Sequence, residues 1–303
     1  MQDKAVAFPT DARLLHKARV ALVRHAKKLG INLRQSYERV GLASFVRSQR
    51  YAHARQINRA NAQNRKLRTY LGRVIRDIER RAQNDHTRTE RLDKLLEIAT
   101  RIHSQPRKRS EGDPPKLYSV HAPQVECIAK GKVHKQYEFG VKVGIVSTSK
   151  ESFVIGAKSL PGNPYDGHTL QACIEQAERV SGLKAKEAYT DRGYRGHGCS
   201  GSTLKVWIAG AKRGVTAAIH RKLKRRNAVE PVIGHLKSDG RLARNFLKGI
   251  EGDAMNALLC GAGHNMRKIL KKLRLLCSQL GIMLRQLLHN TLAWHGPRIL
   301  QAI

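Results

Sequence analysis

Apolar residues recur every three to four positions over the first third of the chain, and this spacing is typical of helices. The pattern predicts a helix from Asp11 to Leu29, with Thr10 or Asp11 as its cap. Three further helices are expected in residues 35–103, with breaks near Asn61 and near Asn84-Asp85. Few β-branched residues cluster in this region, which favours helix over strand.

A loop separates this helical part from a mixed part. Residues 104–116 contain two proline sites, a glycine and a basic run at 107–109, and show neither helix nor strand spacing. After the loop, alternating and Val-rich segments predict short strands, of which the last two form an antiparallel pair. The expected strands are Tyr118–Val120, Val125–Ala129, Tyr137–Val146 and Phe153–Leu160, with a turn at Lys130–Lys132.

Helices and strands alternate over the remaining chain. A helix is expected from Asp166 to about Val180, followed by strands at Ala185–Thr190 and Lys205–Ala209. The chain then becomes helical from Val215 through Glu230, and a last long helix runs from about Asp253 to Asn290 with an interruption at Gly281. This order predicts an α/β fold class, although periodicity does not choose among the mixed folds.

The charge of the chain narrows the class of partner. Lys and Arg number 58 against 23 Asp and Glu, which gives a formal net charge of +35. Such a charge opposes compaction and calls for an anionic partner, and nucleic acid is the first candidate. A merely soluble basic protein is the alternative. No apolar run reaches the roughly 20 residues of a membrane span, and no signal peptide is recognisable, so no membrane partner is expected.

The five cysteines lie far apart, and no two form a CxxC pair. This spacing argues against a zinc ribbon or a disulfide framework, and it fits a reducing compartment. We therefore expect a cytoplasmic protein.

Asp191 follows the predicted strand Ala185–Thr190 and precedes Gly193, which allows a sharp turn. Ligands bind at strand ends in α/β sheets, and magnesium prefers oxygen ligands, so Asp191 is a candidate metal ligand. The alternative is a carboxylate that only satisfies backbone donors in an Asx-turn.

Glu230 stands four residues after Arg226 and seven before Lys237. On a continuous helix these three side chains fall within about 40° of one another, so a metal-binding carboxylate would lie beside cations that can meet phosphate. A surface ion pair worth about 0–1 kcal/mol is the alternative. If Pro231 occupies the first helical position, Glu230 becomes a cap and Arg226 leaves the face.

These residues resemble the DDE transposases of bacterial insertion sequences, in the group with a Tyr–Arg–Glu–Lys pattern around its glutamate. The resemblance covers nearly the whole chain. Besides the surroundings of Asp191 and Glu230, the matching segments are Pro9–Leu15, Lys130–Gly140, Asn163–His168 and Gly249–Asn256. Leu223 stands where the pattern has its Tyr.

The resemblance implies a ribonuclease-H-like mixed sheet with a large helical insertion and a helical C-terminus. Two Asp and one Glu would hold two Mg²⁺ ions for cleavage and joining of DNA strands. Asp191 matches the second Asp and Glu230 the Glu, while Arg226 and Lys237 match the DNA-binding Arg and Lys. The implied partners are transposon terminal repeats and target DNA, with a homo-oligomer also open. The expected divisions are 1–10 (remnant of the first strand region), 11–103 (insertion), 104–116 (linker), 117–290 (catalytic core) and 291–303 (tail).

The start of the chain departs from this pattern. The first Asp of the family lies on a strand that would precede Met1, and neither Asp3 nor Asp11 matches its place. We therefore expect a truncated transposase that is inactive by itself. The alternative is a non-catalytic DNA-binding remnant that competes with or dimerises with an intact transposase, because the positive charge does not depend on the missing carboxylate.

Overall fold

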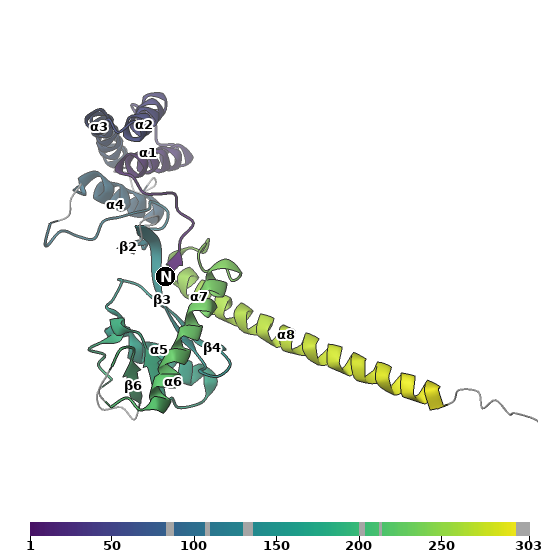
Figure 1. The fold of residues 1–303 in the computed structure, drawn as a ribbon. Helices are drawn as coiled ribbons and strands as arrows, with labels where there is room; N and C mark the ends of the chain where they lie inside the picture. Colours follow the sequence, from purple (N-terminus) through teal and green to yellow (C-terminus); the bar gives the residue numbers. More distant parts are fainter. Residues whose placement is uncertain (83–87, 107–109, 130–135, 200–203, 212–213, 295–303) are drawn as a thin grey trace, which may run out of the picture. The chain divides into compact units, whose positions relative to one another are not determined.

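The computed structural model describes residues 1–82, 88–106, 110–129, 136–199, 204–211 and 214–294. The predicted turn at 130–132, the helix break at 84–85, the basic run 107–109 and most of the tail (295–303) lie outside the described residues. The protein is a mixed α/β chain with small sheets (Figure 1). It divides into two compact units: the first comprises residues 1–142, 159–164 and 244–253, and the second comprises residues 143–158, 165–243 and 254–303.

Four helices form the apolar core of the first unit. They are α1 (Asp11–Lys28), α2 (Glu38–His53), α3 (Ile57–Arg81) and α4 (Glu90–Ser104). Leu22, Leu71 and Leu92 are fully buried at the centre of this core. The hydroxyl of Thr10 caps α1 by accepting from the amide of Arg13.

The predicted three helices of residues 35–103 are confirmed, but the break near Asn61 is wrong. The chain turns between His53 and Ile57, where Arg55 has a φ of 57°. A non-glycine residue in the left-handed region is uncommon, so residue type gave no signal for this turn. Asn61 lies in the second turn of α3 instead.

An antiparallel arrangement connects the chain start to the mixed part. Strand β1 (Gln2–Asp3) and strand β2 (Glu126–Ala129) both pair antiparallel with β3 (Tyr137–Ser147), and β4 (Val154–Leu160) also pairs with β3. The expected strand at Tyr118–Val120 does not form. Its residue Val120 is buried in the helical core together with Leu117, so its apolar character serves helix packing rather than a sheet.

A buried polar cluster holds the N-terminal residues within the first unit. The ammonium of Lys4 lies 2.6 Å from Oδ1 of Asp253. The side-chain amides of Gln2 and Asn245 donate to the same oxygen, at 3.1 and 2.6 Å. Gly140 allows this approach, since a Cβ there would lie 1.9 Å from the carbonyl oxygen of Gln2.

The second unit contains the remaining elements. Helix α5 (Asp166–Ser181) ends directly before Gly182, whose φ of 69° closes the helix close to the expected end at Val180. Strands β5 (Glu187–Thr190) and β6 (Lys205–Ile208) form a parallel pair. Helices α6 (Ala217–Arg225) and α7 (Val229–Ser238) follow, joined by a short 3₁₀ turn. The apolar core of this unit includes Val154, Ala157, Val232 and Leu236.

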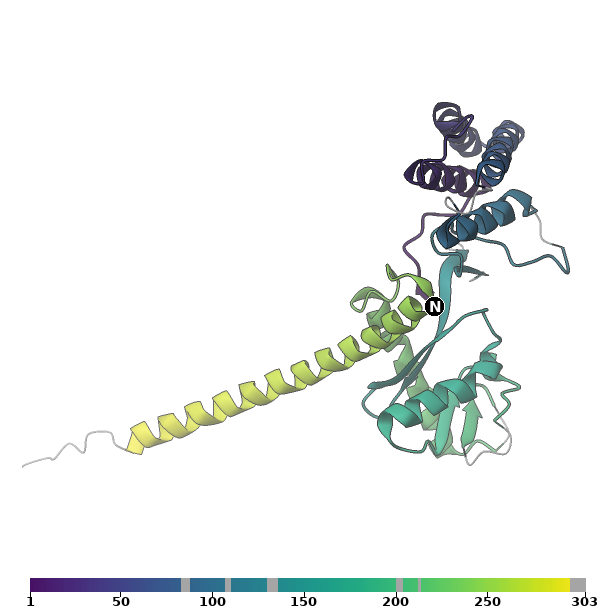
Figure 2. The ribbon, with the colours of Figure 1, turned by 180° about the vertical axis from the view of Figure 1, so that it is seen from behind.

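Helix α8 (Gly249–Trp294) is continuous over 46 residues (Figures 1 and 2). Its residues from 254 onward belong to the second unit. The expected interruption at Gly281 is therefore wrong. One glycine in a helix interior costs only about 1 kcal/mol, and the surrounding Leu, Met, Gln and Arg residues are good helix formers. None of the described helices combines the length and apolar character that a membrane span requires.

Candidate functional site

Asp191 stands directly after β5, at the end of the parallel pair β5–β6. Its Oδ1 accepts a 2.8 Å hydrogen bond from the amide of Arg192 and so caps the short 3₁₀ turn Arg192–Tyr194. Asp191 therefore follows the end of a strand, as predicted, and its carboxylate also caps a turn, as the alternative interpretation proposed. The side chain is 64% exposed, so the capping bond does not withdraw it from ligands.

The turn after Asp191 is shaped by Gly193 in a way that differs from the expectation. Gly193 is not among the glycines with positive φ, so the turn does not require its conformational freedom. Instead, a Cβ at this position would lie 2.8 Å from Oδ2 of Asp166, at the start of α5. Glycine at this position leaves room for the Asp166 carboxylate, so the 3₁₀ turn Arg192–Tyr194 can lie against the start of α5.

No sequence pattern pointed to Tyr194, the last residue of this turn. Burial, and secondarily the carboxylate of Asp166, raises the pKa of Tyr194 to about 12. The contact of Tyr194 with α5 further fixes the segment that carries Asp191.

Arg226 brings the two predicted carboxylates together. Its Nη1 lies 3.1 Å from Oδ1 of Asp191, and its Nη2 lies 3.4 Å from Oε1 of Glu230. The side chain of Arg226 is only 14% exposed, whereas that of Glu230 is 68% exposed. A mostly buried guanidinium thus lies between two carboxylates that face solvent.

Pro231 does not separate Arg226 from Glu230. Helix α7 begins at Val229, so Glu230 and Pro231 both lie in its first turn, where backbone amides have no intrahelical acceptor. Proline is tolerated there. Val232 and Leu236 then bury the opposite side of α7 in the core, which leaves Glu230 on the exposed side.

The predicted cations take different places. Lys237 is half-buried on α7, and a rise of 1.5 Å per residue puts it about 10 Å along the helix from Glu230. Helix α6, directly before the site, exposes Arg221 and Lys224. Leu223 lies between them and is half-buried, which is consistent with a packing role for the residue that replaces the pattern's Tyr.

Two further contacts hold α6 in place. The ammonium of Lys222 lies 2.6 Å from Oε2 of Glu187 on β5, and it is the largest cause of a lowered pKa of that carboxyl. The guanidinium of Arg225 donates to the backbone carbonyls of Ser149 and Lys150. Sequence spacing does not reveal such long-range contacts, although the charge of the segment could have drawn attention to it.

The carboxylates are suitable donors for a hard cation. The guanidinium contacts one oxygen of Asp191 and one oxygen of Glu230, so the second oxygen of each is not used in these ion pairs. Magnesium is commonly held by one or two carboxylates together with water and phosphate. Among the described residues, no cluster of three or more His, Cys, Asp or Glu side chains is placed to hold a metal. The oxygen donors at this place are thus the two carboxylates of Asp191 and Glu230, which both contact the guanidinium of Arg226.

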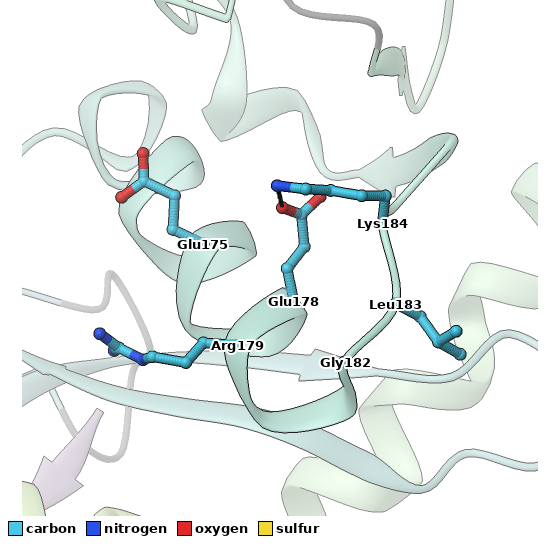
Figure 3. A pocket seen from close by; sticks show the side chains of 6 residues that line it. All are labelled: Glu175, Glu178, Arg179, Gly182, Leu183 and Lys184. Carbon is cyan, nitrogen blue, oxygen red and sulfur yellow. Dashed lines mark hydrogen bonds and ion pairs between the residues drawn. The ribbon is translucent and has the colours of Figure 1, made fainter.

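A shallow hollow at the end of α5 is a separate feature (Figure 3). The ammonium of Lys184 lies 2.7 Å from Oε2 of Glu178, and the other carboxylate oxygen accepts from the amide of Ala185. Asp191, Arg226 and Glu230 are not among its lining residues. Its contacts fasten the chain after α5 and do not contribute to the carboxylate pair.

Comparison with known proteins gives one short match. Over 56 residues the chain is 62% identical to the uncharacterized protein ORF8 in the nfe locus of Rhizobium meliloti. The match spans 18% of this chain and 27% of that protein. No family model and no solved structure matches the chain.

Proposed function

We propose that this protein is of the DDE transposase type and acts in DNA transposition through metal-dependent strand cleavage and transfer at insertion-sequence ends. The observation that carries the proposal is the pairing of Asp191 and Glu230 about the guanidinium of Arg226, at the end of a parallel strand pair. The mixed α/β architecture is compatible with a ribonuclease-H-like core, and the net charge of +35 suits a DNA substrate.

In this proposal Asp191 and Glu230 hold Mg²⁺ through their oxygens. Bound magnesium supplies a Lewis acid for the phosphodiester and lowers the pKa of a water molecule. The exposed Arg221 and Lys224 on α6 meet backbone phosphates beside the pair, and Lys237 extends the cationic surface along α7. Arg226 is mostly buried, so it partly neutralises the two carboxylates rather than contacting DNA directly.

Metal binding and strand nicking test the proposal together. Mn²⁺ is a spectroscopic substitute for Mg²⁺, and its affinity can be measured by water-proton relaxation with the full chain. Asp191→Asn and Glu230→Gln should each weaken Mn²⁺ binding by about tenfold or more, since each removes a charged ligand. The matched control is Glu178→Gln, which removes an ion-paired glutamate of the same unit and should leave the affinity unchanged.

Nicking is measured on plasmid DNA that carries the terminal sequences of the insertion element that encodes the protein, with Mg²⁺ present or chelated. Mg²⁺-dependent nicks that disappear in Asp191→Asn and Glu230→Gln but persist in Glu178→Gln would support strand cleavage by this chain, whereas Mn²⁺ binding at the pair without nicks is the result expected if the chain is inactive by itself. If Mn²⁺ affinity is equal in all four proteins, the assignment of the carboxylate pair is wrong.

A second candidate is a DNA-binding protein without strand cleavage, which competes with or dimerises with an intact transposase. The observation in its favour is that Arg226 already compensates the charge of both carboxylates. This candidate predicts tight, salt-dependent DNA binding, no nicking at any Mg²⁺ concentration, and unchanged DNA affinity in Asp191→Asn and Glu230→Gln.

A further inference from the structure

An apolar stripe runs along the exposed part of α8. Its members follow one another at alternating intervals of three and four residues, which is the heptad repeat of coiled coils. The stripe consists of Leu259, Ala262, Met266, Ile269, Leu273, Leu276, Leu280, Met283 and Leu287. Apart from Ala262, these side chains are between 48% and 64% exposed. The repeat is sustained over four heptads, which is the length expected of a coiled coil, although its flanking positions do not carry the charges that usually accompany one.

The stripe lies on the side of α8 that its own unit does not use. The opposite side packs on the strand–turn segment 151–154: Asn265 exchanges hydrogen bonds with the backbone of Val154, and His264 contacts the carbonyl of Ser152. At about 100° per residue, His264 and Met266 point in directions about 160° apart. From Ile269 to His289 every residue is exposed, so no described element covers the stripe.

The charged residues of α8 lie mainly on the side of the helix that faces away from the stripe. From Ala254 to Trp294 the helix contains six Lys and Arg residues and no Asp or Glu. The positions that flank the stripe on either side are apolar or uncharged, except for Lys272, and Lys272 is already paired with Glu151 at 3.0 Å. The other five cations occupy outer positions of the heptad. A second copy of the same helix can therefore approach the stripe without facing like charges.

This arrangement also distinguishes a protein partner from a lipid surface. A helix that lies on an anionic membrane combines an apolar side with a strongly charged face rich in Lys and Arg. On α8 the last cation before Arg285 is Arg274, while the stripe continues through Leu276, Leu280 and Met283. The apolar repeat thus extends through a segment without charges, which favours another apolar helix as its occupant.

We propose that the stripe from Leu259 to Leu287 is the interface through which two copies of this chain pair as a coiled coil. The paired segment would be about 42 Å long, from 28 intervals of 1.5 Å. The inference depends on α8 alone and does not require the proposed chemistry at Asp191 and Glu230.

The test compares the mass of the full chain with that of two matched double variants by light scattering after size exclusion. Leu273→Glu with Leu280→Glu places charges in the stripe, whereas Leu275→Glu with Ile282→Glu places the same charges on the opposite side of the helix. The stripe pair is 51% exposed at both positions, and the control pair is 58% and 54% exposed. Neither pair disrupts the packed core, and far-ultraviolet circular dichroism checks that helicity is retained.

The wild type and the control pair should both have twice the monomer mass of 34.0 kDa, and the stripe pair should have the monomer mass. The stripe substitutions should raise the dissociation constant of the dimer by more than about 100-fold. A monomeric wild type overturns the proposal, and its binding to anionic phospholipid vesicles would assign the stripe to a lipid surface instead. Equal loss of the dimer in both variant pairs also overturns it, because the stripe would then have no special role.

Discussion

Replacing Asp253 with Ala should destabilise the first unit strongly. The carboxylate is 1% exposed and lies 2.6 Å from the ammonium of Lys4, whose side chain is 4% exposed. It also accepts from the side-chain amides of Gln2 and Asn245. The substitution would leave a buried ammonium without its counter-ion and remove the acceptor of two amide donors. Removing one partner of a buried ion pair costs about 3–5 kcal/mol, a large part of the roughly 5–15 kcal/mol that stabilises an ordinary domain.

A double variant separates the effect of the unpaired buried charge from the effect of the changed side-chain packing. Lys4→Met with Asp253→Leu replaces both charges with apolar groups, so no buried charge remains unpaired. We expect it to lose less stability than Asp253→Ala alone, since apolar replacement of a buried pair is often nearly neutral. Asp239→Ala serves as the control, because Asp239 is 46% exposed and its Oδ2 lies 2.8 Å from Nδ1 of His235 on the surface. A surface pair contributes only about 0–1 kcal/mol.

Hydrogen exchange followed by mass spectrometry is the suitable assay, because two compact units need not unfold together and a single melting curve would mix them. Exchange should accelerate in peptides from residues 1–10 and 137–142 in Asp253→Ala, while peptides from β5 and β6 should remain protected. Unchanged protection of the N-terminal peptides in Asp253→Ala would refute the reasoning.

Three other perturbations have definite expected outcomes. Gly140→Ala should release β1 from β3 and deprotect residues 2–5 in hydrogen exchange, since the new Cβ would lie 1.9 Å from the oxygen of Gln2; Gly198→Ala, with open space around it, is the control. Burial, and secondarily Arg19, lowers the pKa of His16 from 6.5 to about 4. As pH drops, the unfolded state binds the proton before the folded state does, so the free energy of unfolding falls between pH 6.5 and 4. In urea titrations at pH 7 and 4.5, His16→Phe should lose less of its free energy of unfolding on acidification than the wild type does. An equal loss in both proteins would contradict this. Arg226→Gln should tighten Mn²⁺ binding at the carboxylate pair, because a unit charge about 5 Å from a divalent ion contributes roughly 1.7 kcal/mol even in water; weaker binding would mean that Arg226 positions the ligands instead.

Local periodicity predicted most helices of the protein. Helices α1 and α5 begin where expected. They end at Lys28 and Ser181, each within one residue of the predicted ends at Leu29 and Val180. The break at Arg55 was missed because an arginine with positive φ has no residue-type signal. Likewise Gly281 was given too much weight, since a cost of about 1 kcal/mol does not stop a helix of 46 residues.

Contacts between distant segments account for the rest. The amide of Gln2 bonds to Asp253, 251 residues away, and no spacing rule joins two such positions. At the candidate site, the interval of four residues correctly suggested that Arg226 meets Glu230. The contact of the same guanidinium with Asp191 required the packing of α6 against β5, which Lys222 and Glu187 fasten and which periodicity does not encode.

The geometry of Arg226 joins two interpretations of Glu230 that the sequence left as alternatives. An exposed ion pair between Arg226 and Glu230 would contribute little and would indicate no function. Here, however, the cation is mostly buried and the two anions are mostly exposed, so solvent does not screen the group evenly. The guanidinium offsets part of the negative charge of both carboxylates, and it contacts only one oxygen of each. The ion pair therefore partly neutralises Asp191 and Glu230 while both carboxylates remain open to solvent, so a cation that binds the pair has to compete with Arg226.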